Sequence, residues 1–269
     1  MHGPATFWMA LAMRILLVPV EEPTPRRVAW AGAAFGMAVL TRPTTVLFAL
    51  AAELAFLGSR RPKAAVFLGL GAAAPIGLLL LYNAVHFESA LAEGYGSDAL
   101  SWSTPWGLGV AGLVLAPSRG LLVYSPALIL APLGLRAARF AGKRALLLAW
   151  FAAGIATILL YAKWRVWWGG WCFGPRFLCE TMPIFCLMFA LAYDRLRTGI
   201  CRRAAWALVS LSMAIHFLGV FGHHVGWNRR HEGSLDGRGL FSLSDTQIEA
   251  HAIYFMERVA GSREATDRP

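Results

Sequence analysis

Charged residues are scarce in this 269-residue chain. Only 15% of its residues are Asp, Glu, Lys or Arg, whereas a soluble domain has roughly a quarter. Hydrophobic residues make up 57%, and the mean hydropathy is +0.54. Because each membrane-spanning helix needs about 20 mostly apolar residues, this composition favours an all-α integral membrane protein with the lipid bilayer as its first partner. An ordinary soluble globular protein is excluded.

Cysteine is also rare, and its spacing fits no common metal or redox motif. The four cysteines are Cys172, Cys179, Cys186 and Cys201, and none forms a C-x-x-C pair. Cys179 and Cys186 are a heptad apart in one predicted helix and so share a face. The pattern favours buried structural thiols, with a metal site or a disulfide as the alternative. We therefore expect no metal and no cofactor.

Acidic residues are outnumbered by basic ones, which gives a net charge of +10. In a soluble protein this charge would suggest a nucleic-acid partner. Here the cations gather in short clusters between apolar segments, so membrane topology explains them. No nucleic-acid partner is expected.

Apolar segments separated by short polar connections fill most of the chain. They are Ala5–Val20, Val28–Leu40, Thr44–Leu57, Ala64–Tyr82, Gly120–Leu135, Ala145–Tyr161, Phe177–Tyr193 and Ala204–Gly222. Several are shorter than a full crossing, and around Arg42 two short helices are predicted to meet at a turn because Pro43 cannot continue the first. Non-helical backbone at membrane depth persists only where it is buried in protein or lines a wet cavity. The fold prediction is about eight transmembrane or half-membrane helices, with outer loops carrying the site.

The basic residues predict the orientation. Thirteen fall on alternate connections and five on the opposite short ones, so the positive-inside rule places the thirteen in the cytoplasm. The thirteen are Arg26, Arg27, Arg60, Arg61, Lys63, Arg136, Arg139, Lys143, Arg144, Arg195, Arg197, Arg202 and Arg203, and the five are Arg42, Arg119, Lys163, Arg165 and Arg176. We therefore predict a polytopic transmembrane domain over residues 1–222 and an extracytoplasmic tail over residues 223–269.

The first residues, "MHGPATFWMALAMRILL", lack the features of a secretory signal peptide. No basic region precedes the apolar run, and no small-residue cleavage site follows it. The predicted topology nevertheless places this end outside the membrane. A chain that begins outside without its own insertion signal is expected to be the later part of a longer protein.

The most unusual stretch is "AKWRVWWGGWCFGPRFLCETMPIF", residues 162–185. Its Trp residues, Trp168 among them, fit an aromatic belt at the membrane interface. The Gly169–Gly170 pair fits a belt less well and predicts a tight turn that a ligand or another segment approaches closely. Arg176 opens the next helix at its outer end, where backbone N–H groups favour an anion, and Glu180 one turn on could pair with it. The combination suits a lipid-linked phosphate or a sugar.

Three further residues are candidates for binding the same phosphate. An arginine between two short apolar helices, as at Arg42, costs several kcal/mol unless it is paired or wet, so Arg42 either snorkels to the headgroups or anchors a phosphate together with Arg176. In "LAPSRGLLVYSPALILAP", residues 115–132, a turn at 117–120 enters a helix that two prolines would kink. Arg119 and Tyr124 would face a cavity there, and a merely structural kinked helix is equally consistent with the spacing.

Carboxylates of the predicted outer side concentrate in "NAVHFESALAEGYGSDALSWSTPWG". Glu88, Glu93 and Asp98 are the best external acids, and Glu93 and Asp98 are weak candidates for catalysis. A solvated loop is the alternative for each of them.

The order of several motifs resembles that of bacterial GT-C-type multi-spanning glycosyltransferases, relatives of the protein O-mannosyltransferases and the aminoarabinose transferase of lipid A. The motifs are "GMAVLTRPT", "YNAVHFESALAEGYG", "APSRGLLVYSPALIL", "WWGGWCFGPRFLCETMPI", "WNRR" and "LFSLSDTQI", and the resemblance runs from about Pro4 to Ile248. It implies a transferase that uses a polyprenyl-phosphate-linked sugar on the outer face of a bacterial inner or plasma membrane, with an acceptor that the motifs do not identify.

The resemblance also implies a reaction mechanism, and it shows that one segment of the family pattern is missing from this sequence. The lipid phosphate would leave while a carboxylate acts as base towards the acceptor hydroxyl. In that family the base lies in an outer loop just after the first spanning helix, and this sequence shows no such helix and loop. The resemblance therefore implies a C-terminal portion that binds the donor but does not transfer the sugar alone.

Two other classes of protein remain open at the level of sequence. A transporter or lipid flippase also has broken helices and intramembrane charges, although such proteins usually show internal repeats, which we do not find here. A non-catalytic membrane scaffold would leave the clustered outer Arg, Tyr and Trp residues unexplained.

Overall fold

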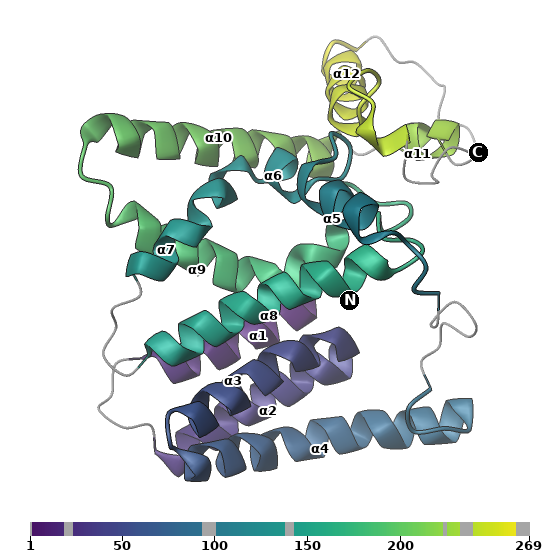
Figure 1. Ribbon diagram of the computed structural model, residues 1–269. Helices are drawn as coiled ribbons and strands as arrows, with labels where there is room; N and C mark the ends of the chain where they lie inside the picture. Colours follow the sequence, from purple (N-terminus) through teal and green to yellow (C-terminus); the bar gives the residue numbers. More distant parts are fainter. Residues whose placement is uncertain are drawn as a thin grey trace. The chain divides into compact units, whose positions relative to one another are not determined.

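The computed structural model describes residues 2–18, 24–92, 101–137, 143–222, 225–231 and 239–261, and every regular element in these ranges is a helix (Figure 1). The all-α prediction is therefore confirmed for the described part of the chain. By its internal contacts the chain divides into two compact units. Unit 1 comprises residues 1–103, 130–160 and 178–195, and unit 2 comprises residues 104–129, 161–177 and 196–269.

Unit 1 is built mainly of long apolar helices. They are α1 (His2–Leu17), α2 (Pro25–Thr41), α3 (Val46–Gly58), α4 (Pro62–Phe87), α7 (Ala131–Ala137), most of α8 (Arg144–Lys163) and α9 (Met182–Tyr193). Helix α2 packs against both α1 and α4, and α7 packs against α9 (Figure 1). This arrangement makes α2 the central helix of its group.

Glycine permits the close approach of α2 and α4. A Cβ atom on Gly32 would lie 2.0 Å from the carbonyl oxygen of Leu68, and one on Gly71 would lie 2.0 Å from that of Ala29. Gly36, four residues after Gly32, faces the backbone of α4 in the same way. Small residues spaced by four let two helix backbones meet, which is a common way to join helices within a membrane.

The predicted break at Arg42 is present. Helix α2 ends at Thr41, Arg42 is extended with φ −155° and ψ 103°, and Pro43 begins the short 3-10 helix η1 (Pro43–Thr45). Proline disfavours the helical conformation of the residue before it, which explains why the chain turns here.

Unit 2 contains α5 (Trp106–Leu115), α6 (Leu121–Tyr124), α10 (Gly199–Phe221), α11 (Gly226–His231), η6 (Gly239–Phe241) and α12 (Gln247–Val259). Helix α5 was not predicted, because its residues were assigned to an outer loop. A Cβ on Gly109 would lie 1.9 Å from the Ala162 carbonyl, and one on Gly112 would lie 2.2 Å from the ring of Trp167. These two glycines therefore seat α5 closely on the segment that follows Tyr161.

The predicted segment Gly120–Leu135 breaks rather than kinks. Helix α6 ends at Tyr124, the 3-10 helix η3 (Pro126–Leu130) follows Ser125, and α7 begins at Ala131. Pro126 has no backbone N–H and keeps Ser125 out of the helical region, so the chain changes direction there. The turn predicted at residues 117–120 is present and leads into α6.

Among the described residues, four helical segments are long and apolar enough to cross a membrane. They are Pro62–Phe87, Arg144–Lys163, Arg176–Tyr193 and Gly199–Phe221, and shorter apolar helices lie at Pro43–Gly58, Trp106–Leu115 and Pro126–Ala137. In α4 and α10 most of the apolar surface is exposed, including Leu70, Leu81, Met213 and Val220. Such exposed apolar faces are compatible with lipid contact. The finer prediction of about eight crossing or half-crossing helices, and the domain boundary at residue 222, stay predictions.

All four cysteines are free thiols, and none of them is fully buried. Cys186 and Cys201 are exposed, and Cys172 and Cys179 are half-buried. The expectation of buried structural thiols is therefore wrong for Cys186 and Cys201.

Candidate functional site

Six of the seven residues predicted to bind a substrate lie in unit 2, and Arg42 lies in unit 1. The six are Arg119, Tyr124, Trp168, Gly169, Gly170 and Arg176. Within unit 2 the structure adds three further residues to them, Trp227, Asn228 and Gln247, which contact Arg119. We call Arg119, Tyr124, Trp227, Asn228 and Gln247 the Arg119 cluster.

Arg119 is fully buried, and every group that it contacts is electrically neutral. Nη1 donates to the Ser118 carbonyl at 3.1 Å and to Oε1 of Gln247. Nη2 donates to the Gly170 carbonyl at 3.2 Å and to Oδ1 of Asn228 at 3.1 Å. The guanidinium also lies over the ring of Trp227, 5.3 Å from its centroid. The cluster thus holds a cation by amide, carbonyl and π contacts alone.

Gln247 connects the parts of the cluster. Its Oε1 accepts from Tyr124 Oη at 3.0 Å and from the Gly174 backbone N–H at 3.2 Å, as well as from Arg119. Its Nε2 donates to the Cys172 carbonyl at 2.7 Å. The side chain is fully buried, so these bonds replace all contact with water.

Local structure explains how Gln247 reaches this position. It is the first residue of α12, which begins with a capping box between Thr246 and Glu249. The Gln247 backbone N–H donates to Ser118 Oγ at 3.3 Å, which ties the start of α12 to the turn that holds Arg119. Burial raises the pKa of the Tyr124 phenol, so its O–H remains a donor to Gln247 at any physiological pH.

The positive charge of Arg119 has no opposite charge beside it within the described residues. No carboxylate contacts its guanidinium there, and its Nε and the Nδ2 of Asn228 have no hydrogen-bond partner among them. An uncompensated buried cation is costly unless an anion joins it. The Arg119 cluster is therefore suited to an anionic ligand.

The Gly169–Gly170 turn borders the cluster. Both residues have positive φ angles, 86° and 68°, which a side chain would strain. Nothing lies within 4 Å of a Cβ placed on Gly170, whose carbonyl accepts from Arg119, whereas a Cβ on Gly169 would meet Cγ of Arg176 at 3.2 Å. The turn therefore has open space at Gly170, and the side chain of the exposed Arg176, the first residue of the 3-10 helix η4 (Arg176–Thr181), lies beside it at Gly169.

The Trp residues of this stretch have different surroundings. Trp167 is buried and rests on Gly112, while Trp168 is half-buried and contacts the Trp167 ring edge-on at 5.8 Å between centroids. Trp171 is 45% exposed. Trp168 and Trp171 therefore keep ring surface available for a ligand or for the membrane interface.

A small cavity adjoins the cluster at Trp227. Its volume is about 130 Å³, and its lining includes Trp227, Arg230, Asp245, His251 and Tyr254. Arg230 pairs with Asp245 at 3.3 Å between Nη2 and Oδ1. Aromatic walls with a few convergent polar groups are typical of small-molecule sites.

In unit 1, Arg42 is paired inside the protein. Its Nε lies 3.2 Å from Oε1 of Glu180, and the same oxygen lies 2.9 Å from Nδ1 of His2. Glu180 is 2% exposed and Arg42 is 14% exposed. Glu180 therefore pairs with Arg42, not with Arg176 as its spacing had indicated. The joint binding of one phosphate by Arg42 and Arg176 stays a prediction, since they belong to different units.

The candidate catalytic acids Glu93 and Asp98 lie outside the described residues. Glu88 is exposed at the end of α4, where it adopts a left-handed conformation with φ 59°. Within the described ranges, no group of three or more His, Cys, Asp or Glu residues could hold a metal ion.

Sequence reasoning did not assign roles to Gln247, Asn228 and Trp227. A signal existed, because "WNRR" and "LFSLSDTQI" belong to the motifs that carry the family resemblance. Their side chains meet Arg119 only after the chain folds, so spacing alone could not select them. No family model matches the chain, and neither the curated proteins nor the solved structures contain a match to it.

Proposed function

We propose that this chain is a GT-C-like membrane glycosyltransferase that binds the phosphate of a polyprenyl-phosphate-linked sugar at Arg119. The observation that carries the proposal is a fully buried arginine with neutral partners only, among the described residues. A phosphate supplies the missing negative charge. Arginine suits this ligand because its planar fork matches phosphate oxygens, which a point charge does not.

The surroundings of Arg119 support a phosphate carried on a lipid. Open space lies at the Cβ position of Gly170, and the Gly170 carbonyl accepts from Arg119, so a ligand at this turn would lie next to a partner of the guanidinium. The side chain of the exposed Arg176 lies beside this turn at Gly169 and adds a second cation. Trp168 and Trp171 offer ring surface of the kind found where a protein meets the membrane interface.

The sugar is assigned to the cavity at Trp227. One face of Trp227 lies against Arg119, and the residue also lines the cavity, so a phosphate and a sugar linked to it would lie on neighbouring sides of one ring. Asp245 and Arg230 supply polar groups for sugar hydroxyls. Glu93 and Asp98 stay the candidates for the base that receives the proton of the acceptor hydroxyl.

Binding of the phosphate is tested with the purified full chain in nanodiscs of neutral lipid. We expect polyprenyl phosphate to bind at least tenfold more tightly than the uncharged polyprenol, because a charge-assisted hydrogen bond contributes about 1.5–3 kcal/mol. Arg119→Gln should abolish this preference, whereas Arg119→Lys should keep part of it. Equal binding of the two lipids would contradict the proposal.

Because Arg119 is buried, its variants could unfold the protein. A variant at an exposed position, which leaves the fold intact, is therefore tested beside them. Arg176→Gln removes the exposed cation beside the Gly169–Gly170 turn and should weaken the binding of polyprenyl phosphate about fivefold. Arg229→Gln, also exposed and in unit 2, is the matched control and should bind like the wild type. An equal effect of the two exposed variants would show a general charge effect and no site at the turn.

Transfer is measured separately from binding, as release of sugar from a polyprenyl-phosphate-linked donor. Turnover that is lost in Glu93→Gln or Asp98→Asn, with donor binding unchanged, would assign the base. Binding without turnover is the outcome that the family resemblance implies for this chain alone, and turnover by the unaltered chain would contradict that expectation.

A further inference from the structure

Unit 1 carries a groove that is basic along one part and apolar along another. Its volume is about 400 Å³, within the usual range for ligand sites. Three elements form it: the first turns of α2, the connection after α3, and the first turns of α4. The lining residues are Pro25, Val28, Arg60, Arg61, Pro62, Lys63, Ala64 and Phe67. We call these residues the basic groove.

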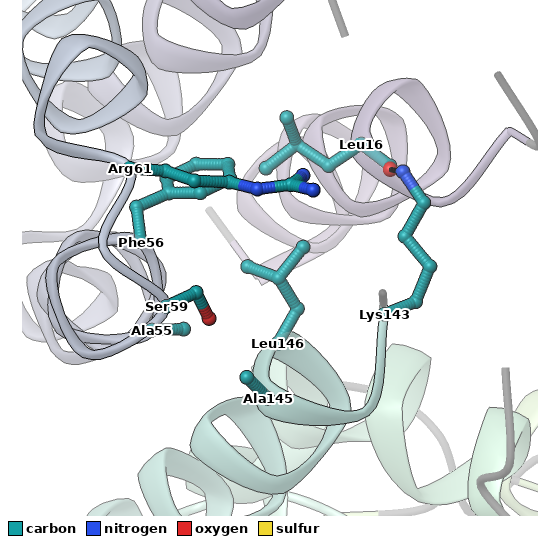
Figure 2. A pocket seen from close by; sticks show the side chains of 8 residues that line it. All are labelled: Leu16, Ala55, Phe56, Ser59, Arg61, Lys143, Ala145 and Leu146. Carbon is teal, nitrogen blue, oxygen red and sulfur yellow. Dashed lines mark hydrogen bonds between the residues drawn. The ribbon is translucent and has the colours of Figure 1, made fainter. Parts of the chain in front are cut away.

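Among the described residues that line the groove, three are cations and none is acidic. Arg60 and Lys63 are exposed, and Arg61 is half-buried. Arg61 also lines a neighbouring cavity of about 10 Å³, roughly the room for one water, where its guanidinium extends past Phe56 towards Leu16 (Figure 2). The groove therefore has two exposed cations at its surface and a third that extends inward.

A further cation stands behind the groove in the same unit. Lys143 lines the small cavity with Arg61, and its Nζ donates to the Leu16 carbonyl at 2.8 Å (Figure 2). Burial, and then the charges of Arg27 and Arg61, lower the pKa of Lys143. Three cations, Arg27, Arg61 and Lys143, therefore lie close enough to act on one another at this end of unit 1.

The backbone holds the first cations of the groove in fixed positions. Arg60 adopts a left-handed conformation with φ 55°, and its N–H bonds to the Leu57 carbonyl at 3.0 Å. The N–H of Arg61 bonds to the Phe56 carbonyl at 2.8 Å, which closes the end of α3. Helix α4 then begins at Pro62, so Lys63 follows in its first turn. The end of α3 and the start of α4 therefore set the spacing between Arg60 and Lys63.

We propose that the basic groove binds an anionic phospholipid, with its phosphate between Arg60 and Lys63 and an acyl chain along Phe67 and Ala64. A soluble anion would use the cations but not the apolar wall, whereas a phospholipid uses both. The same cations belong to the thirteen that the charge asymmetry assigns to the cytoplasmic side, so the lipid would come from the cytoplasmic leaflet. This inference is independent of the proposed function, whose cations are Arg119 and Arg176.

The test is native mass spectrometry of the purified full chain with phosphatidylglycerol or phosphatidylcholine added in neutral detergent. We expect preferential retention of phosphatidylglycerol. Arg60→Gln with Lys63→Gln should weaken it about 25-fold, since each cation near an anionic headgroup contributes about fivefold in affinity. The control is Arg144→Gln with Arg195→Gln, which removes the same charge from exposed positions of unit 1 outside the groove. Equal effects of the two double variants would overturn the proposal.

A second pair of variants tests the apolar wall. Phe67→Ala should weaken phosphatidylglycerol several-fold, whereas Leu70→Ala, an exposed apolar position of α4 outside the groove, should not. Glycerol phosphate, which has the headgroup chemistry without the chains, is the soluble competitor and should displace the lipid poorly. Efficient displacement together with no effect of Phe67→Ala would show a site for soluble anions and overturn the lipid. A thermal unfolding curve for each variant establishes that the fold is retained.

Discussion

Arg42 in unit 1 and Arg119 in unit 2 are both largely buried arginines close to a proline, but their partners differ. Arg42 contacts the carboxylate of Glu180, and the His2 ring contacts both of them. Arg119 contacts two side-chain amides, two carbonyls and a Trp ring. The same side chain is thus neutralised by an ion pair in one unit and held only by dipoles in the other.

The difference separates a structural role from a binding role. A buried ion pair already has its counter-charge, so an added phosphate would have to displace Glu180 or share Arg42 with it. Arg119 has no such competitor among the described residues, and its Nε has no hydrogen-bond partner among them. Two arginines that look equivalent in the sequence therefore differ in their charge partners, and for this reason we propose Arg119, and not Arg42, as the main phosphate ligand.

Removal of the carboxylate in unit 1 should have the largest effect. Glu180→Gln removes the buried carboxylate that contacts Arg42, so we expect the free energy of unfolding to fall by about 3–5 kcal/mol. Thermal and denaturant unfolding in detergent measure this loss. Asp194→Asn, an exposed acid at the end of α9, is the matched control and should change stability by less than about 0.5 kcal/mol. Similar values for the two variants would mean that the ion pair contributes nothing.

Addition of a carboxylate in unit 2 should give Arg119 an ion-pair partner, as Glu180 is for Arg42. Gln247→Glu keeps the shape of the side chain and places a negative charge on the guanidinium that now contacts Oε1. We expect polyprenyl phosphate to bind at least tenfold more weakly while the protein stays folded. Binding isotherms and unfolding curves on the same preparation distinguish the two effects. Unchanged phosphate binding would show that Arg119 is not the phosphate ligand.

Loss of one neutral donor from the Arg119 cluster should have a moderate effect. Tyr124→Phe removes the O–H that lies 3.0 Å from Gln247 Oε1, and we expect a stability loss of about 1 kcal/mol. Arg119 still donates to that oxygen, so phosphate binding should fall less than twofold. A large loss of phosphate binding would instead indicate that Tyr124 contacts the ligand directly.

The smallest effect is expected at Gly170, where the backbone demands a left-handed residue but the space is open. Gly170→Asn should cost less than about 1 kcal/mol, because Asn tolerates positive φ better than most residues. Gly169→Asn is the paired variant and should cost more, since its Cβ would press on Arg176 and Cys172. The reverse order would mean that Gly170, and not Gly169, is the crowded position.

Local patterns in the sequence were sufficient for several features. Low charge and long apolar segments predicted an all-helical chain, because backbone groups in a membrane must bond within their own segment. Pro43 predicted the break after Thr41, and Pro117–Gly120 predicted the turn that holds Arg119. Each of these features depends on a few neighbouring residues, so a short stretch of sequence is enough to predict it.

Other features needed the tertiary structure. Helix α5 has only ten residues, too few to signal a crossing, and it packs closely only because Gly109 and Gly112 meet Ala162 and Trp167. The break at Pro126 was expected as a kink, since the sequence does not show how far a chain turns at a proline.

The sequence by itself determined which residues could bind a phosphate, and the tertiary structure decided which of them keeps its charge available. Glu180 reaches Arg42 through the packing of unit 1, although its nearest basic neighbour in sequence is Arg176. Gln247 reaches Arg119 across 128 residues. The reason is that a counter-charge acts over a few ångströms in space, and contacts between distant segments are set by helix packing, which local spacing does not specify.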